Sequence, residues 1–270
     1  MHTRRTLTED IAHRWKTVST SQTIFVRYLT VFLCLAHCAI DKLTPSEPSS
    51  GLWCIFDGHG GRQVSDYCES RFPIEWKKEM MKNPSNLEQP LTNSFAKINN
   101  ELRLLDADGC GSTACVAVTR KEGNQNVLYV ANIGDSRAVL SKNGQAERLS
   151  VDDKCDDPGE NARVKGMGGI IVDNRIGGVL AVTRAFGDHA LIKCGLIATP
   201  HIVRHVIKPF EKYLIIASDG IWDELSDQDA VSLCNDDCTT KQIALTIVKT
   251  ALTRGSKDNI SVLVIRLNEA

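Results

Sequence analysis

The feature that most constrains this chain is a short apolar segment that ends abruptly in a carboxylate. Residues 52–56 (LWCIF) are long enough for a buried strand, and Asp57 follows them directly. Three glycines after Asp57 let the backbone turn at little steric cost, and they surround His59. A carboxylate and an imidazole at the tip of a rigid strand are suitably placed for chemistry.

The same arrangement recurs at three more strand ends. Acidic residues border the other apolar segments as follows: Asp135 after 127–133, Asp219 and Asp223 after 213–218, and Asp258 before 260–267. Carboxylates that gather at one end of a core repel one another unless they are protonated or bridged by cations. An oxygen-only set suits Mg²⁺ or Mn²⁺, and two such ions activate water against a phosphate ester. The alternative is that each aspartate only caps a turn.

The order of the apolar patterns indicates the fold class. Helical spacing occurs at 64–72, where Pro73 is expected to interrupt or end the helix, and again at 91–105 and 243–252. Runs of short strands separate these helical segments, including a hairpin at 138–149 around Asn143-Gly144. Because strands and helices do not alternate regularly, we expect an α+β protein with antiparallel sheets.

Composition excludes several classes of function. The net charge is −1 with no basic block, so nucleic acid is not expected as a partner. The ten cysteines are scattered over 270 residues and include no CxxC pair. We therefore expect reduced thiols in an intracellular protein, not a disulfide framework or a zinc site.

The apolar run at 24–40 needs a separate interpretation. Its seventeen residues are at the short limit for a membrane span, and Arg27 and His37 interrupt it. We expect a buried element, and a membrane-anchored form is the alternative. The run is an insertion in a first hairpin, a divergent strand pair or translated non-coding sequence.

Taken together, the motifs resemble a known family. They are FDGHGG (56–61), GSTA (111–114), VANIGDSRAVL (130–140), LAVTRAFGD (180–188), ASDGIWD (217–223) and SKDNISVLVI (256–265). In this order they are similar to the metal-dependent protein serine/threonine phosphatases of type 2C. The resemblance implies a four-layer αββα sandwich, in which two antiparallel sheets are flanked by pairs of helices. It also implies one domain: a catalytic core at 51–270 and a divergent segment at 1–50 that contributes the first strands and an apolar insertion at 24–40.

The resemblance further implies the chemistry. A hydroxide bridging two Mn²⁺ or Mg²⁺ ions hydrolyses phosphoserine or phosphothreonine in proteins, without a phosphoenzyme. Asp57 bridges the ions and Gly58 offers its carbonyl, while Asp219 and Asp258 complete the ligand shells. His59 protonates the departing oxygen as a general acid.

Other residues follow from the same motifs. Asp135, Asp219 and Asp223 match a weaker third metal site. The pattern RTLTED at 5–10 makes Arg5 the phosphate-binding residue and Glu9 a water-mediated metal ligand, although Arg14 or Arg27 could take the place of Arg5. Arg184 could reach the site, but we expect it to form a salt bridge that shapes its loop.

The biological setting is predicted only broadly. We expect a monomer that acts on phosphoprotein substrates in the cytoplasm or nucleus, with neither nucleic acid nor membrane as a partner. The alternative from a different class is a catalytically impaired pseudophosphatase that serves as a binding or scaffold module. The reason to consider this alternative is the atypical N-terminal segment.

Overall fold

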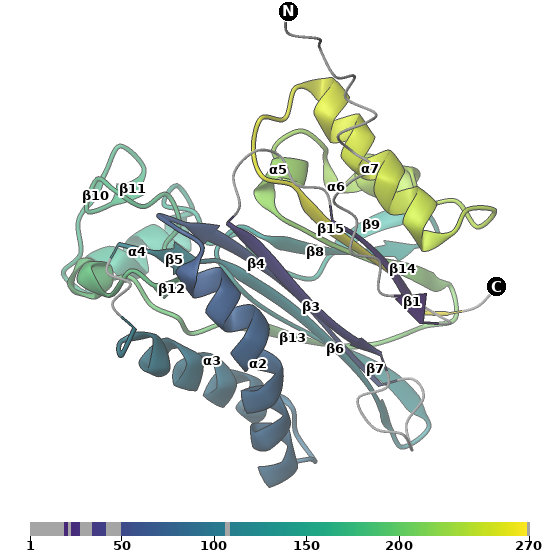
Figure 1. The fold of residues 1–270 in the computed structure, drawn as a ribbon, viewed down its shortest axis with the longest axis horizontal. Helices are drawn as coiled ribbons and strands as arrows, with labels where there is room; N and C mark the ends of the chain where they lie inside the picture. Colours follow the sequence, from purple (N-terminus) through teal and green to yellow (C-terminus); the bar gives the residue numbers. More distant parts are fainter. Residues whose placement is uncertain (1–18, 21–22, 28–33, 42–49, 106–108, 269–270) are drawn as a thin grey trace, which may run out of the picture. The chain divides into compact units, whose positions relative to one another are not determined.

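The computed structural model describes residues 19–20, 23–27, 34–41, 50–105 and 109–268. The chain divides into two compact units. The large unit comprises Cys34–Ala138 and Arg148–Lys208, and the small unit comprises Met1–Leu33, Val139–Glu147 and Pro209–Ala270. Each unit contains an antiparallel sheet and helices that pack on it (Figure 1). This confirms the α+β class expected from the sequence.

The sheet of the large unit follows the order β12-β5-β4-β6-β7-β13, and β3 pairs with β4. The strands are β3 (Leu35–Asp41), β4 (Gly51–His59), β5 (Gly111–Ser112), β6 (Ala114–Glu122), β7 (Gln125–Ile133), β12 (Phe186–Gly187) and β13 (His201–Val206). β4 is the strand predicted before Asp57, and its residues from Gly51 to Phe56 are all buried. β4 pairs with β3 on one side and with β6 on the other, and Leu35 of β3 lies opposite Asp57. This pairing fixes the position of Asp57 along the strand.

Two helices cover one face of this sheet (Figure 1). They are α2 (Gln63–Lys82) and α3 (Glu88–Leu102). Phe56 of β4, Phe72 of α2, Phe95 of α3 and Phe186 of β12 form a chain of rings, with successive centroids 5.8, 5.3 and 5.1 Å apart. These contacts join both helices to the strands beneath them.

Pro73 does not interrupt or end α2, which continues to Lys82. A proline inside a helix removes one backbone hydrogen bond and crowds the preceding turn. The fully buried Phe72 and Trp76 flank it and pack into the core. Burial of two large aromatic side chains therefore outweighs the local penalty.

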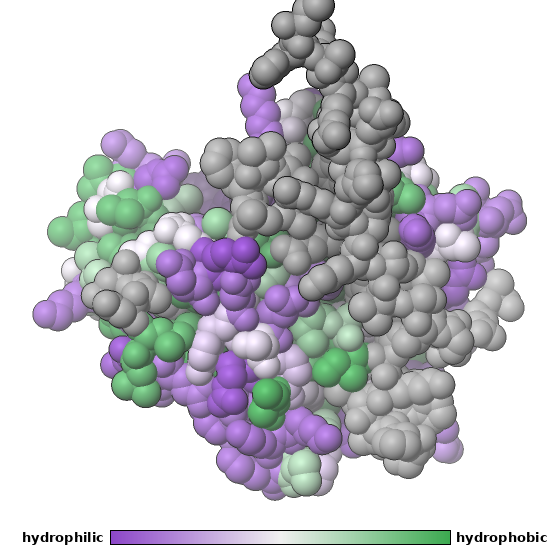
Figure 2. Space-filling view, viewed as in Figure 1, coloured by the Kyte–Doolittle hydropathy of each residue, from purple (hydrophilic) through white to green (hydrophobic). Residues whose placement is uncertain are grey.

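A smaller lobe of the large unit contains α4 (Pro158–Gly166), β10 (Ile171–Val172), β11 (Arg175–Ile176) and the 3₁₀ helix η1 (His189–Cys194). Its own apolar cluster includes Val164, Ile176 and Leu196. Outside this cluster, Ile170 and Val179 are each 64% exposed. Figure 2 shows apolar surface in the region of β10 and β11.

The sheet of the small unit follows the order β1-β2-β15-β14-β8-β9. Its strands are β1 (Ser19–Thr20), β2 (Thr23–Arg27), β8 (Arg137–Lys142), β9 (Gln145–Arg148), β14 (Glu211–Ala217) and β15 (Ser261–Arg266), and its helices are α5 (Asp219–Trp222), α6 (Asp227–Ser232) and α7 (Thr240–Arg254). α7 packs on β15 and β2. A capping box at Thr239 begins it, and Gly255, with a φ of 112°, ends it.

Within the apolar run at 24–40, the described residues other than Cys34 belong to two strands. β2 pairs with β15, placing Val26 opposite Val262, and β3 pairs with β4, placing Cys38 opposite Cys54. β2 thus belongs to the sheet of the small unit, and β3 belongs to the sheet of the large unit. Among the described residues, no helix has both the length and the apolar character needed to cross a membrane. All ten cysteines are free, as expected.

The chain of phenylalanine rings generates a stability prediction. Phe95→Ala should lower the free energy of unfolding by about 3–5 kcal/mol, since it removes a fully buried ring between two others. Urea denaturation followed by circular dichroism measures this change. Met81→Ala is the control, because Met81 lies on α2 with 70% of its surface exposed and should change the value by less than about 0.5 kcal/mol. Equal effects of the two substitutions would contradict this description of the core.

Candidate functional site

The turn that contains Asp57 is fixed from two sides. The Thr113 backbone N–H donates to the Asp57 carbonyl at 2.8 Å, and the Asp57 N–H donates to Thr113 Oγ1 at 3.4 Å. On the other side, the Gly58 N–H donates to the Cys34 carbonyl at 2.9 Å. The backbone around Asp57 is therefore held between β3 and the segment that joins β5 to β6.

Thr113 also reaches the turn that contains Asp135. Its Oγ1 is hydrogen-bonded to Ser136 Oγ at 2.7 Å. Gly134, with a φ of +83°, lets the two segments approach, because a Cβ at this position would lie 2.6 Å from Thr113 Cγ2. One threonine thus connects the Asp57 turn with the Asp135 turn, which the sequence placed at the ends of separate strands.

Asp135 lies in a poorly solvated position. The residue is only 8% exposed, and this burial raises the pKa of its carboxyl above the ordinary value. Lys154 Nζ, 3.5 Å from Asp135 Oδ2, lowers the pKa, whereas the charge of Asp152 raises it. The Asp135 carboxylate is therefore a hard oxygen donor whose neighbouring positive charge in this structure is that of Lys154.

The small unit holds its acidic residues in two joined turns. Asp219 begins α5 and Asp223 ends it, while Asp258 lies just before β15. The Ser218 N–H donates to the Ser261 carbonyl at 3.1 Å, and the Ser261 N–H donates to Ser218 Oγ at 3.1 Å. These bonds bring the turn of Asp219 beside the turn of Asp258.

Gly220 permits this close approach. A Cβ at position 220 would lie 2.3 Å from the Asn259 carbonyl oxygen, so any other residue would push the two turns apart. Ser256 Oγ donates to the Gly220 carbonyl at 2.8 Å and closes the turn from the far side. The sequence ASDGIWD therefore needs its glycine for packing against the segment of Asp258.

The donor chemistry fits hard divalent cations. In each unit the groups at these turns are carboxylates and backbone carbonyls, which suit Mg²⁺ or Mn²⁺ better than zinc. The predicted residues Arg5 and Glu9, with the alternative Arg14, lie outside the described residues. Arg27 ends β2 opposite Ser261, and only its backbone is described.

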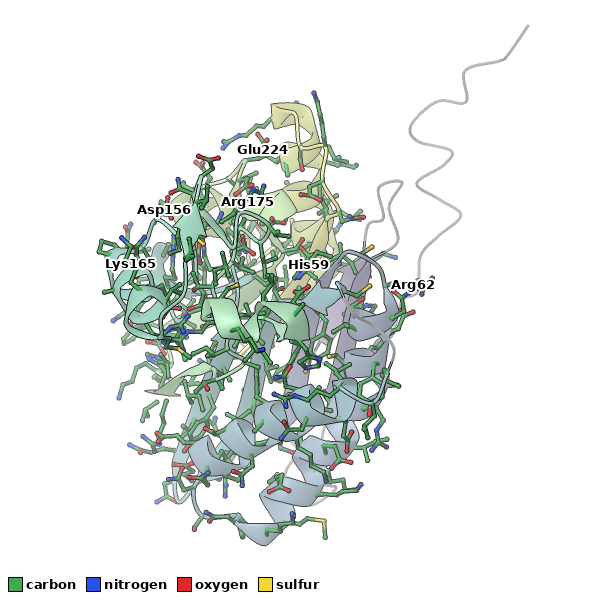
Figure 3. All side chains as sticks on the ribbon, turned by 90° about the vertical axis from the view of Figure 1, so that its left-hand side faces the viewer. His59, Arg62, Asp156, Lys165, Arg175 and Glu224 are labelled. Atoms are coloured by element: carbon green, nitrogen blue, oxygen red, sulfur yellow. The ribbon has the colours of Figure 1, made fainter. Side chains whose placement is uncertain are left out.

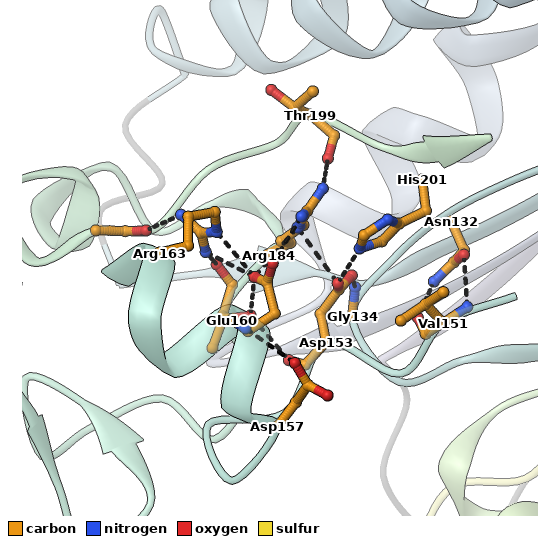
Figure 4. Close-up of polar contacts among 12 residues, drawn as sticks. Asn132, Gly134, Val151, Asp153, Asp157, Glu160, Arg163, Arg184, Thr199 and His201 are labelled. Carbon is orange, nitrogen blue, oxygen red and sulfur yellow. Dashed lines mark hydrogen bonds and ion pairs between the residues drawn. The ribbon is translucent and has the colours of Figure 1, made fainter. Parts of the chain in front are cut away.

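A second charged cluster lies around Arg184 (Figure 4). Arg184 Nη2 is 2.6 Å from Glu160 Oε1, and its Nε is 3.3 Å from Asp153 Oδ1. His201 Nε2 is 2.8 Å from the same Asp153 oxygen. The salt bridge predicted for Arg184 is confirmed.

This cluster is a network of ion pairs, although it contains side chains that commonly bind metal ions. Atoms of Asp153, Glu160 and His201 lie within 4.8 Å of one another, a spacing that could hold a metal ion. The Arg184 guanidinium already contacts both carboxylates, and Arg163 Nη2 donates to Glu160 Oε2 at 2.7 Å. A divalent cation would therefore be repelled by two fixed positive charges.

Asp153 connects this network to the acidic turns. Its Oδ2 accepts from the Gly134 N–H at 2.8 Å, immediately before Asp135. Contacts thus run from Arg184 through Asp153 and Gly134 to Thr113 and Asp57. No sequence pattern marks Asp153, whereas Thr113 lies within the GSTA motif.

His59 has a specific partner within the large unit. Its Nε2 is hydrogen-bonded to Asp188 Oδ2, in the loop that follows β12. Figure 3 labels His59 and, three residues further on, Arg62 at the start of α2. Asp188 is the last residue of the LAVTRAFGD segment, whose pattern alone predicts no contact with His59.

Solved structures resemble this fold. A sex-determining protein of Caenorhabditis elegans matches with a TM-score of 0.77 and 22% identity, over 95% of this chain and 66% of that one. The serine-threonine phosphatase 2C of Toxoplasma gondii matches with a TM-score of 0.73 and 22% identity, over 93% and 96%. The fold is therefore that of the type 2C phosphatases.

Sequence comparisons establish the family. The family model described as protein phosphatase 2C matches residues 25–260. Protein phosphatase 2C homolog 1 of Schizosaccharomyces pombe is 40% identical over 222 residues, which are 80% of this chain and 64% of that protein. The homolog 1 of Saccharomyces cerevisiae is 35% identical over 231 residues, or 80% and 82%. This chain belongs to the protein phosphatase 2C family.

The ion-pair network generates a pH-dependent prediction. Burial raises the pKa of Glu160, but hydrogen bonds from Arg184, Arg163 and Thr183 outweigh it and lower the pKa from 4.5 to about 2. Ionised Glu160 therefore stabilises the fold fully above about pH 5, and its contribution is lost as the pH falls from 4.5 towards 2. Glu160→Gln should lower the free energy of unfolding at pH 7 by about 3 kcal/mol.

Urea denaturation of the wild-type chain and Glu160→Gln between pH 7 and pH 3.5 measures this effect. The difference between them should shrink below about pH 4.5. Asp66→Asn is the matched control, because its ion pair with Arg62 is exposed and should contribute less than about 1 kcal/mol at any pH. A pH-independent difference for Glu160→Gln would contradict the assignment.

Proposed function

We propose that this chain is a protein serine/threonine phosphatase that hydrolyses phosphoserine and phosphothreonine with Mn²⁺ or Mg²⁺. The observation that supports this most is the fixed backbone at Asp57, where hydrogen bonds of Thr113 join the segments of Asp57 and Asp135. Rigid carboxylates at strand ends are what a metal-dependent hydrolase requires. Family membership and the complete set of motifs from residue 56 onwards support the proposal.

By motif position, the ligands of two divalent cations are Asp57, the Gly58 carbonyl, Asp219 and Asp258. Asp135 and Asp223, together with Asp219, are the ligands proposed for a weaker third ion. When bound, such ions supply an activated water and neutralise the charge of the phosphate group. Manganese and magnesium are proposed from the oxygen-only donor set.

The chain's own residues perform the remaining tasks. His59 gives a proton to the departing serine or threonine oxygen, which would otherwise leave as a strongly basic alkoxide. Its side chain is 31% exposed, so a phosphorylated protein segment can reach it. Arg5 is proposed to bind the substrate phosphate and Glu9 to hold a metal-bound water.

The setting is proposed from the sequence. A monomer in the cytoplasm or nucleus that acts on phosphoproteins agrees with the balanced charge and the free cysteines. The motive for the catalytically impaired alternative is the atypical segment at 1–50, of which the structure describes residues 19–20, 23–27, 34–41 and 50. None of the comparisons supports that alternative.

Turnover of an aryl phosphate and of a phosphoserine peptide tests the proposed function. Both reactions should require Mn²⁺ or Mg²⁺ and stop when EDTA is added. Asp57→Asn and Asp219→Asn should each lower kcat at least about 100-fold, because each replaces an anionic ligand by a neutral amide. Asp66→Asn removes an exposed carboxylate of α2 and should leave kcat unchanged.

Circular dichroism establishes that each variant is folded. Turnover that persists in EDTA, or in folded Asp219→Asn, would contradict the proposal. Folded wild-type protein without turnover at any Mn²⁺ concentration would instead support the catalytically impaired module.

A further inference from the structure

The contact between His59 and Asp188 is built by three separate segments of the large unit. His59 ends β4, Gly111 begins β5, and Asp188 follows β12. β5 lies between the other two strands in the sheet, since Gly111 pairs with both His59 and Gly187. The pair therefore spans this end of the sheet across Gly111.

Gly111 leaves the space in which the two side chains meet. A Cβ at position 111 would lie 1.9 Å from Asp188 Oδ2 and 2.4 Å from His59 Nε2. The backbone of Gly111 is not in the left-handed region, so its conformation does not require glycine. The missing side chain is needed because the imidazole and the carboxylate occupy its place.

Asp188 is held rigidly and is largely withdrawn from water. Its φ of 43° is in the left-handed region, which non-glycine residues rarely adopt. Its N–H donates to the Cys110 carbonyl at 2.9 Å, and its carbonyl accepts from the Leu191 N–H at 2.8 Å. The Asp188 side chain is 6% exposed, whereas that of His59 is 31% exposed. The carboxylate is thus the more buried member of the pair, and the imidazole is the member that solvent reaches.

From this geometry we infer that Asp188 is a positioning residue that orients His59 and holds a proton on its Nε2. An ionised carboxylate only accepts hydrogen bonds, so it fixes the N–H of the ring on the nitrogen that faces it. The proton of the imidazolium that can be transferred is then the one on Nδ1. This inference rests on the proposed function, since it concerns how His59 performs its step.

Water supplies the oxygen that forms the new bond to phosphorus, and it releases a proton to solvent. The bond between phosphorus and the serine or threonine oxygen breaks, and its electron pair stays on that oxygen. The proton on His59 Nδ1 passes to the oxygen and forms the hydroxyl group of the product. A neutral imidazole remains, with its Nε2–H donated to Asp188, and solvent water returns the proton to Nδ1 before the next turnover.

Leaving groups of different basicity test the inference. In the presence of Mn²⁺, Asp188→Ala should lower kcat for a phosphoserine peptide by about 10- to 100-fold, because an alkoxide needs protonation. For p-nitrophenyl phosphate, whose leaving group is a weak base, the decrease should be less than about threefold. KM should change little for either substrate. Asp188→Asn, which keeps an acceptor oxygen, should fall between Asp188→Ala and the wild-type chain.

A double-mutant cycle separates positioning from a general structural effect. His59→Gln combined with Asp188→Ala should be no slower on the peptide than His59→Gln alone, because Asp188 acts only through His59. Gly111→Ala should reproduce the leaving-group signature, since its Cβ would displace the carboxylate. The control is Glu122→Gln, which breaks an ion pair with Arg204 at the tip of the β6–β7 hairpin and should leave the ratio of the two activities unchanged.

Three outcomes are distinguishable. A wild-type chain that turns over neither substrate with Mn²⁺ overturns the proposed function. Turnover by the wild-type chain, combined with equal losses on both substrates in Asp188→Ala, overturns the positioning role alone, as does additivity with His59→Gln. Should thermal denaturation show that Asp188→Ala is unfolded, Asp188→Asn and Gly111→Ala decide the question by the same ratio.

Discussion

The site in the large unit depends on the hydrogen bonds of one buried threonine. Thr113 fixes the Asp57 backbone in both directions and binds Ser136 beside Asp135. Two carboxylates that would repel each other in a mobile loop are therefore held by their backbones at strand ends. Preorganisation of this kind means that little reorganisation is needed when a cation binds.

In the small unit, two serines hold the acidic turns in place. Ser218 and Ser261 exchange hydrogen bonds between the turn of Asp219 and the turn of Asp258. Gly220 allows the approach here, as Gly134 does beside Thr113. In both units a hydroxyl side chain and a glycine without steric bulk position an acidic turn.

The strand-end carboxylates could be predicted from the sequence because each borders an apolar run with strand character. The salt bridge of Arg184 was also predicted correctly. Three features could not be predicted in this way: the passage of α2 through Pro73, which depends on burial of Phe72 and Trp76, and the contacts of Asp153 and Asp188. Both aspartates meet their partners through tertiary structure, Asp188 at a separation of 129 residues, which no local pattern encodes.

Calorimetric titration of Mn²⁺ into the metal-free chain tests most directly whether these turns form a metal site. The wild-type chain should bind two ions, and Asp57→Asn should bind them with lower affinity. Thr113→Val, which keeps the shape but removes the hydroxyl, should weaken binding by about 10- to 100-fold, as expected when the support of a ligand is removed. Absence of Mn²⁺ binding to folded wild-type protein, or unchanged affinity in Asp57→Asn, would contradict the account.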